Sequence, residues 1–329
     1  MKKIGLGLIG LGFIGKIHLR HLLKMPNVNL VAVSDLSKRA LKEAKNAGVK
    51  KTFTSYEQLL NEPNIDAVII ALPTHLHLRS AIQASEAGKH ILLEKPIARN
   101  LEEAKEIVTV AQKNSVKLMM GYPLRFNESF RELKTKMQSG TLGDVEIAIA
   151  TYLSSGPFFH RAESHIPLPV PQWWLNKSLT GGGALIDVGS HIINLLRWYF
   201  GEITHITSHL GYRFNLDLED SAICFAKFES GTRAVITTGW FMQGYQLKVE
   251  LLGTVDRVIA QYLPEKSLQQ TVTHLLTNNT SGFHMPHFNE VVHFVNCIIN
   301  DSLPSPSGKD GLKDLEAICK AYKNSIRLD

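Results

Sequence analysis

Apolar runs bounded by glycine or proline dominate roughly the first third of the chain. Runs without a polar face, such as residues 4–9, 66–72 and 90–93, predict strands that are buried on both sides. Helical patterns lie between them, as at residues 38–47 and 101–114. Further strands are expected at 29–34, 51–54 and 117–120, and further helices at 16–24, 56–61 and 78–87. This alternation predicts a doubly wound parallel sheet.

The pattern changes near Gly121. From there on, apolar and polar residues partly alternate in short runs separated by turns, which predicts a largely antiparallel sheet with one face open. Strands are expected at 145–153, 206–212, 221–228, 232–240 and 248–252, and helices at 183–199, 287–300 and 311–325. The fold class is therefore α/β in domain 1–121 and α+β in domain 122–329. An open sheet face predicts at least a homodimer, or a homotetramer.

Composition narrows the class of protein. With 329 residues, 44% of them hydrophobic and 20% charged, the chain resembles an ordinary soluble protein of two domains. The net charge of +6 is scattered among acids, which argues against nucleic acid as a partner but suits an anionic cofactor or substrate. No apolar run reaches the ~20 residues of a membrane span. No signal peptide precedes the first strand, and three cysteines without C-x-x-C spacing predict a reduced, cytoplasmic protein. The 14 histidines form no zinc motif, so no metal is expected.

A glycine motif follows the first strand. Gly10-Leu-Gly12-Phe-Ile-Gly15 matches G-x-G-x-x-G between a strand and a helix, the context in which the motif binds a dinucleotide. Gly10 permits a tight turn, Gly12 lets the backbone approach a pyrophosphate, and Gly15 allows close packing of helix on strand. The amides at the start of the helix then attract the diphosphate.

Asp35 ends the second strand, 20 residues after Gly15. A carboxylate there accepts hydrogen bonds from the ribose hydroxyls and repels a 2′-phosphate, which favours NAD. Ser37, Lys38 and Arg39 offer groups for that phosphate, so NADP stays open. In the simpler alternative the glycines make only a tight turn and Asp35 only caps a helix.

Lys95 lies at the same edge of the predicted sheet. The breaks after three strands, at Gly10, at residues 73–77 and at residues 94–96, all fall at the carboxyl edge where ligands bind. A lysine beside Leu93 and Pro96 is a poor candidate for a free surface charge. We expect a cis Lys95–Pro96 bond that directs the side chain inward.

A second chemical candidate is the helix that begins at Gly181-Gly-Gly183. Asp187, His191 and Asn194 are spaced to share one face of a regular helix, surrounded by apolar residues. A buried stripe of acid, imidazole and amide needs a ligand or internal partners. Both alternatives, a binding site and a self-satisfied core network, stay open at this point.

These segments together resemble the Gfo/Idh/MocA family of oxidoreductases. The matching segments are residues 10–15, Asp35, and residues 72–77, 94–96, 121–127 and 181–191. The resemblance implies a Rossmann domain, an α/β domain with an open sheet, a nicotinamide cofactor, and a sugar, cyclitol or sugar-nucleotide substrate. It assigns catalysis to Lys95, Asp187 and His191. The residues expected at the cofactor are Gly10, Gly12, Phe13, Ile14, Gly15, Asp35, Pro73, Thr74, His77, Glu94 and Lys95.

Two departures from the family pattern concern the substrate. Asn194 stands where an acid is common, and only Arg125 is carried over from the segment after Gly121. We expect both residues, and Trp174, to contact substrate, although a tryptophan pair such as Trp173 and Trp174 is more often core. A Pro-rich insertion contains His160, Arg161 and His165, which either fold over the active site or form a surface loop.

The expected reaction is oxidation of a secondary hydroxyl to a ketone, or its reverse. His191 would accept the hydroxyl proton, Asp187 would orient His191, and Lys95 would stabilise charge on the oxygen. Two rivals are transhydrogenation between sugars with a tightly held cofactor, and a nucleotide-binding regulator without turnover.

Overall fold

The structure is a computed structural model that describes residues 3–158, 171–242, 244–262 and 285–326. The chain divides into two compact units, Met1–Pro123 with His287–Leu312, and Leu124–Pro286 with Lys313–Asp329. The predicted boundary between residues 121 and 122 lies close to Pro123, after which the chain passes from the first unit to the second. It placed residues 287–312 in the second domain, whereas the structure places them in the first unit, where Phe294 and Val295 are buried.

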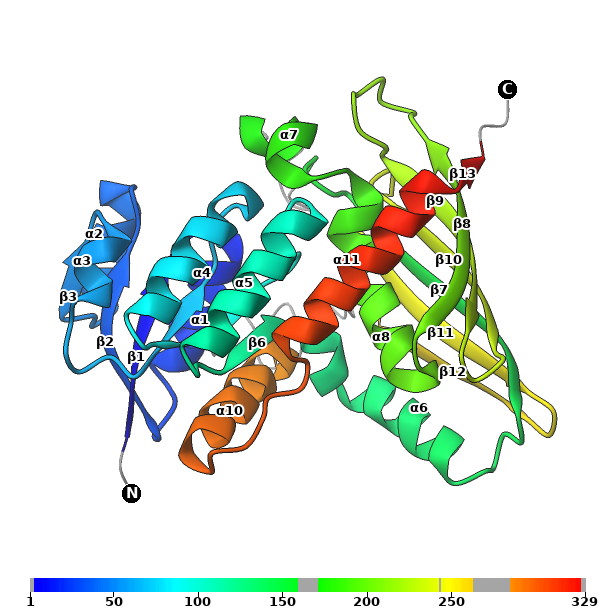
Figure 1. Ribbon diagram of the computed structural model, residues 1–329, viewed down its shortest axis with the longest axis horizontal. Helices are drawn as coiled ribbons and strands as arrows, with labels where there is room; N and C mark the ends of the chain where they lie inside the picture. Colours follow the sequence, from blue (N-terminus) through cyan, green and yellow to red (C-terminus); the bar gives the residue numbers. More distant parts are fainter. Residues whose placement is uncertain (1–2, 159–170, 243, 263–284, 327–329) are drawn as a thin grey trace, which may run out of the picture. The chain divides into compact units, whose positions relative to one another are not determined.

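Six parallel strands form the sheet of the first unit, in the order β3-β2-β1-β4-β5-β6 (Figure 1). They are β1 (Ile4–Ile9), β2 (Val28–Ser34), β3 (Lys51–Phe53), β4 (Ala67–Ile70), β5 (His90–Glu94) and β6 (Leu118–Gly121). The central strands β1 and β4 are buried along their whole length, as their apolar sequences predicted. The chain turns in opposite directions from β1, which creates a switch point between β1 and β4.

Helices connect these strands. They are α1 (Phe13–Leu22), α2 (Lys38–Asn46), α3 (Tyr56–Leu60), η1 (Thr74–Leu76), α4 (His77–Glu86) and α5 (Leu101–Lys113). Ser37 and Asn100 start α2 and α5, and each side chain accepts a hydrogen bond from the backbone of the first turn. The helix α10 (Met285–Ile299) also packs in this unit. After it, the carbonyl of Pro306 accepts a hydrogen bond from the amide of Met120 on β6.

The second unit contains a seven-stranded sheet in the order β12-β11-β7-β10-β9-β8-β13. Its strands are β7 (Val145–Ser154), β8 (Ile203–Gly211), β9 (Ser221–Phe228), β10 (Arg233–Gly239), β11 (Tyr245–Gly253), β12 (Arg257–Tyr262) and β13 (Ser325–Ile326). The prediction of a largely antiparallel sheet is confirmed, with β7–β10 and β8–β13 as parallel pairs. The sequence analysis missed β12 and the short β13.

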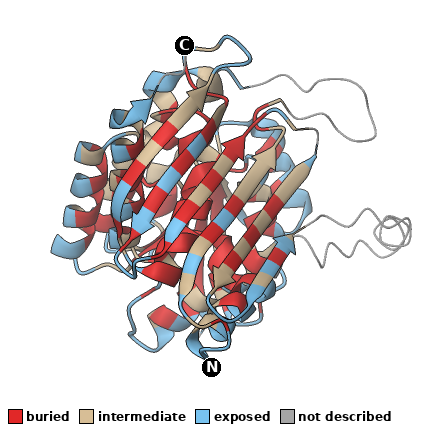
Figure 2. Ribbon diagram, turned by 90° about the vertical axis from the view of Figure 1, so that its right-hand side faces the viewer, coloured by how far each residue is buried: buried red, intermediate tan, exposed pale blue. Residues whose placement is uncertain are grey.

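The helical elements of the second unit are η2 (Pro123–Phe126), α6 (Glu128–Gln138), η3 (Gln172–Leu175), α7 (Lys177–Thr180), η4 (Leu185–Gly189), α8 (Ser190–Phe200) and α11 (Gly308–Lys323), the last shared with the first unit. Figure 2 shows one face of this sheet, which no helix of the described residues covers, with buried and exposed residues alternating along its strands. The predicted open face is thus present. No helix in the described ranges is both long and apolar enough to cross a membrane.

Candidate active site

The three glycines between β1 and α1 have different surroundings. Gly10 has a φ of +95°, and a Cβ there would lie 2.4 Å from the carbonyl oxygen of Ala71. A Cβ at Gly15 would lie 2.1 Å from the carbonyl oxygen of Gly10, so α1 packs directly on the turn. A Cβ at Gly12 would meet nothing within 4 Å. Packing therefore requires Gly10 and Gly15, whereas Gly12 borders open space.

The start of α1 has the properties of an anion site. No side chain caps the helix at Gly12, and its first turn contains no acidic residue. Phe13 is 65% exposed and Ile14 is half-buried. Uncapped amides and the positive end of the helix dipole both favour a bound anion. The segment from Gly10 to Gly15 therefore fits the pyrophosphate of a dinucleotide.

Asp35 faces this turn from the end of β2. Its Oδ2 accepts a hydrogen bond from the amide of Leu11 at 2.6 Å, and its Oδ1 accepts one from the amide of Ser37 at 2.7 Å. The carboxylate is half-buried and lies beside the glycines, as the motif predicted. Ser37 caps α2, and Arg39 pairs with Glu43, so both have contacts of their own.

His77 connects two of the loops at this edge of the sheet. Its Nδ1 lies 2.9 Å from the carbonyl oxygen of Pro96, and its Nε2 lies 2.9 Å from that of Leu72. Burial lowers the pKa of His77, and the two carbonyls oppose that effect. The ring therefore braces the loops after β4 and β5. Pro73 precedes η1 and Thr74 is buried in it, so cofactor contact by these residues stays a prediction.

Lys95 follows β5 and is half-buried. The Lys95–Pro96 peptide bond is cis, as predicted. The side chain of Glu94 is buried and its Oε1 lies 2.8 Å from His18 Nε2, and the cofactor contact expected of Glu94 stays a prediction. A Cβ at Gly121 would lie 2.9 Å from Glu94 Oε2, so the carboxylate packs on the backbone of β6.

In the second unit, the carboxylate of Glu219 bonds to the backbone near the glycines that precede Asp187. Both oxygens of Glu219 accept hydrogen bonds from the amide of Gly183, at 3.0 and 3.1 Å, and Oε1 also accepts one from Leu185 at 3.0 Å. A Cβ at Gly183 would lie 1.8 Å from the carbonyl oxygen of Glu219. Because Gly183 has no side chain, the segment that carries Glu219 packs directly against its backbone.

The helix that follows is not regular. Leu185–Gly189 is π-helical, and α8 begins only at Ser190. The prediction of one regular helix over residues 183–199 is wrong here, because two amides at its start bond to Glu219 and the turn after them is widened. Single π-helical turns occur frequently at functional sites.

Asp187 and His191 lie on this irregular turn and the first turn of α8. The indole N–H of buried Trp240 donates to Asp187 Oδ2 at 3.1 Å. The rings of Tyr152 and His191 lie 5.7 Å apart, centroid to centroid. Burial raises the pKa of Tyr152, and the charge of Asp187 raises it further, so Tyr152 is a neutral phenol at neutral pH. An acid, an imidazole and a phenol thus lie close together within one unit.

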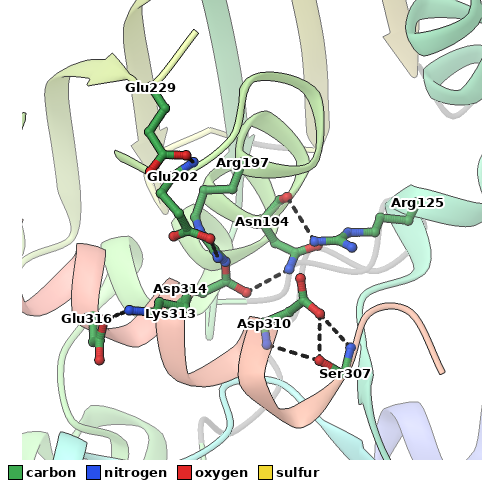
Figure 3. Close-up of polar contacts among 10 residues, drawn as sticks. All are labelled: Arg125, Asn194, Arg197, Glu202, Glu229, Ser307, Asp310, Lys313, Asp314 and Glu316. Atoms are coloured by element: carbon green, nitrogen blue, oxygen red, sulfur yellow. Dashed lines mark hydrogen bonds and ion pairs between the residues drawn. The ribbon is translucent and has the colours of Figure 1, made fainter. Parts of the chain in front are cut away.

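Asn194 belongs to a buried network (Figure 3). Its Oδ1 accepts a hydrogen bond from Arg125 Nε at 2.7 Å, and its Nδ2 donates to Asp314 Oδ2 at 2.7 Å. Asp314 also pairs with Arg197, which pairs in turn with Glu202. Burial raises the pKa of Asp314 to about 6, while Arg197 and Asn194 limit the rise, so the carboxyl is ionised at neutral pH.

This network decides between the two alternatives for Asn194. Both ends of its amide are used by Arg125 and Asp314, and all three side chains are buried. The core-network alternative therefore describes Asn194 and Arg125 better than the predicted substrate contact does. Asp314 on α11 thus places a carboxyl group next to Asn194.

The remaining candidates are tryptophans and the insertion. Trp173 and Trp174 lie on η3, are half-buried, and stack with ring centroids 5.8 Å apart. Substrate contact by Trp174 stays a prediction. His160, Arg161 and His165 lie outside the described residues.

Sequence reasoning missed Tyr152, Trp240 and Glu219. Tyr152 stands in an ordinary alternating strand, and Trp240 follows the end of β10, so neither position carries a local motif. The only sequence signal for Glu219 was the run of glycines that receives it.

Comparison with known proteins bears on both units. The family model described as "Oxidoreductase family, NAD-binding Rossmann fold" matches residues 4–122. The model described as "GFO/IDH/MocA C-terminal domain" matches residues 130–258.

Two enzymes of known reaction are similar along nearly the whole chain. Myo-inositol 2-dehydrogenase of Thermotoga maritima is 27% identical, over 93% of this chain and 91% of that protein. Scyllo-inositol 2-dehydrogenase (NAD(+)) of Bacillus subtilis is also 27% identical, over 97% of this chain and 93% of that protein.

Solved structures share the fold. Scyllo-inositol dehydrogenase from Lactobacillus casei, with bound NAD(H) and scyllo-inositol, aligns with a TM-score of 0.81 and 23% identity over 98% of this chain and 97% of that chain. A levoglucosan dehydrogenase complex with NADH and levoglucosan aligns with a TM-score of 0.83 and 22% identity, with the same coverage.

Proposed function

Since the chain belongs to the GFO/IDH/MocA family of NAD-binding oxidoreductases, we propose that it oxidises a secondary hydroxyl of a sugar or cyclitol to a ketone, or catalyses the reverse reduction. The family resemblance and the NAD cofactor inferred from motifs are thereby confirmed. The substrate class is supported by relatives that act on myo-inositol and scyllo-inositol. Sugar nucleotides belong to the same proposal, because they offer the same carbinol.

The observation that carries the proposal is the contrast among the glycines of the cofactor turn. Gly10 and Gly15 are fixed by neighbouring backbone, while Gly12 borders open space at an uncapped helix start. A dinucleotide would place its pyrophosphate there and its ribose at Asp35. When bound, NAD supplies the acceptor for the hydride.

We assign the proton chemistry to His191. Histidine is the side chain that most often acts as a general base for a hydroxyl proton. Asp187 is held by Trp240 and would orient His191 or pass the proton on. Lys95 would donate a hydrogen bond to the substrate oxygen and stabilise its developing charge.

The test uses substrate oxidation by the whole chain. Polyols, sugars and nucleotide sugars are supplied with NAD or NADP, and reduced cofactor is followed by absorbance. Lys95→Ala and His191→Ala should each lower kcat about 100-fold or more, the size of a general acid–base contribution, while NAD still binds by fluorescence titration.

The matched controls are Lys105→Ala and His205→Ala, which remove the same side-chain types from exposed positions. Both controls should keep the wild-type kcat. Near wild-type turnover in Lys95→Ala and His191→Ala would end the catalytic assignment. NAD that stays with the protein through gel filtration would favour transhydrogenation over simple dehydrogenation.

We also propose that the open sheet face joins two copies of the chain. Four large apolar side chains on that face are between 36% and 57% exposed: Ile149, Ile223, Phe225 and Ile259. Phe225 and Ile223 alternate on β9, opposite Val235 and Thr237 of β10. Large apolar side chains gathered on an exposed face are typical of an interface.

A further inference from the structure

A compact polar cluster in the interior of the first unit joins three of its elements. It consists of His18 on α1, Glu94 at the end of β5 and Glu290 on α10. His18 and Glu290 are fully buried, and Glu94 is 7% exposed. One ligating atom from each residue lies within 4.8 Å of the other two.

Only some of the polar atoms in this cluster have hydrogen-bond partners among the described residues. His18 Nε2 and Glu94 Oε1 are 2.8 Å apart. Neither carboxyl oxygen of Glu290 makes a hydrogen bond to any residue that the structure describes. A carboxylate charge without hydrogen bonds is strongly disfavoured in a protein interior. Glu290 must therefore be neutralised by a proton or by a bound cation.

The surroundings of Glu290 favour the proton. Burial raises the pKa of Glu290 well above its ordinary value, and the negative charge of Glu94 raises it further. The nearby backbone amide of Tyr122, after β6, opposes these effects more weakly, although its geometry is not that of a hydrogen bond. His18 from α1 and His287 from α10, whose ring lies edge-on to His18 at 6.1 Å, complete the titratable groups placed around the cluster.

The hydrogen bonding of His18 indicates that a proton, and not a metal ion, neutralises Glu290. Its Nδ1 is buried and has no hydrogen-bond partner within the described ranges. If Nε2 donates to Glu94, Nδ1 carries only a lone pair, which is tolerated unpaired more often than a buried N–H. If Nε2 bound a metal ion, Nδ1 would carry the proton and lack an acceptor, unlike most metal-bound histidines.

We propose that Glu290 is a neutral carboxylic acid packed beside Glu94, and that this contact positions Lys95. Glu94 is the last residue of β5 and adjoins Lys95, so an interaction that fixes the Glu94 carboxyl also fixes the start of the loop that carries the lysine. Glu290 is thus a positioning residue, and only the role given to Lys95 rests on the proposed function. Ionisation of Glu290 would place two like charges in the interior and disturb that loop.

The protonation is tested first, without substrate. Glu290→Gln keeps the size of the side chain and is neutral at every pH. The infrared spectrum of the wild type minus that of Glu290→Gln at neutral pH should contain the C=O stretch of a protonated carboxyl. The control is Glu103→Gln, because Glu103 is another buried carboxylate of this unit but is paired with Arg99. Carboxylate bands in the first difference, or a stoichiometric divalent metal in the purified wild type, would overturn the proposal.

The pH dependence of unfolding tests the same proton independently. A raised pKa in the folded state means that the stabilisation from protonated Glu290 is complete below the unfolded pKa of about 4.3 and is lost as pH rises through the folded pKa. In that window the unfolding equilibrium constant of the wild type should rise about tenfold per pH unit relative to Glu290→Gln. A constant ratio across the window would contradict the proposal.

Kinetics then test the positioning role. Glu290→Gln should keep the wild-type kcat at neutral pH, because the neutral amide replaces a neutral acid. Glu290→Leu, which removes the carboxyl group beside Glu94, should lower kcat about 10- to 100-fold, the range for a misplaced catalytic group, with the KM for NAD unchanged. Wild-type kcat in Glu290→Leu would refute the positioning role. A wild type that oxidises no substrate would refute the proposed function instead, and the infrared and unfolding results would stand.

Discussion

Replacement of Gly12 by alanine separates cofactor binding from folding. Gly12 has φ −65° and ψ −162°, a backbone conformation that alanine adopts readily, and its new Cβ would meet nothing within 4 Å. The free energy of unfolding should therefore stay the same or rise by about 0.4–1 kcal/mol, because alanine restricts the unfolded chain. The added methyl group would occupy the space that the pyrophosphate needs.

The cost to binding follows from the same geometry. Forcing a methyl group into a close contact typically costs about 1–3 kcal/mol, which corresponds to a roughly 5- to 150-fold rise in the Kd for NAD. Fluorescence titration of NAD measures the Kd, and thermal unfolding measures stability. A folded Gly12→Ala variant that binds NAD like the wild type would refute the assignment of the pyrophosphate to this turn.

Gly15→Ala is the matched opposite case. Its Cβ would lie 2.1 Å from the carbonyl oxygen and 2.8 Å from the carbonyl carbon of Gly10, and backbone atoms cannot move aside as a flexible side chain can. A loss of about 3 kcal/mol should lower the Tm by roughly 5–10 °C. Gly88→Ala serves as the control, because φ there is +69° but the Cβ meets nothing, so it should lose about 1 kcal/mol without affecting NAD.

Two further predictions concern the second unit. Asp314→Asn removes the charge that faces Arg197 in the buried network and should lower the free energy of unfolding, measured in urea, by about 3 kcal/mol. The control Asp217→Asn, at an exposed position, should change the free energy of unfolding little. A loss below about 1 kcal/mol in Asp314→Asn would show that Glu202 alone compensates the charge of Arg197. Phe225→Glu should convert the wild-type oligomer to a monomer in gel filtration with light scattering, while Leu303→Glu, at an exposed apolar position outside this sheet, should not. A monomeric wild type would refute the proposed interface.

The sequence predicted the first sheet well because its strands leave few alternatives. A run such as Ile4–Ile9, apolar along its whole length and followed by glycines, fits only a strand buried on both faces. In the structure, Ser37 and Asn100 cap the starts of two of the predicted helices. Local pattern and final structure agree at these positions because both depend on the same few residues.

The features that were missed depend on residues far apart in the chain. The π-helical turn at Leu185–Gly189 follows amides held by Glu219, more than 30 residues later, so the local period could not reveal it. The partner of Asn194 is Asp314, 120 residues away. Candidate residues could therefore be named from motifs, but the distinction between a ligand contact and an internal contact required the fold.

The return of residues 287–312 to the first unit has a consequence for dissecting the molecule. A fragment that stops at Pro123 would contain every motif for the nucleotide yet lack α10, whose Phe294 and Val295 are buried, and the Pro306 carbonyl that bonds to β6. Such a fragment should aggregate instead of acting as an autonomous nucleotide-binding module. Substitutions that disrupt the packing of residues 287–312 should for the same reason lower the affinity for the dinucleotide.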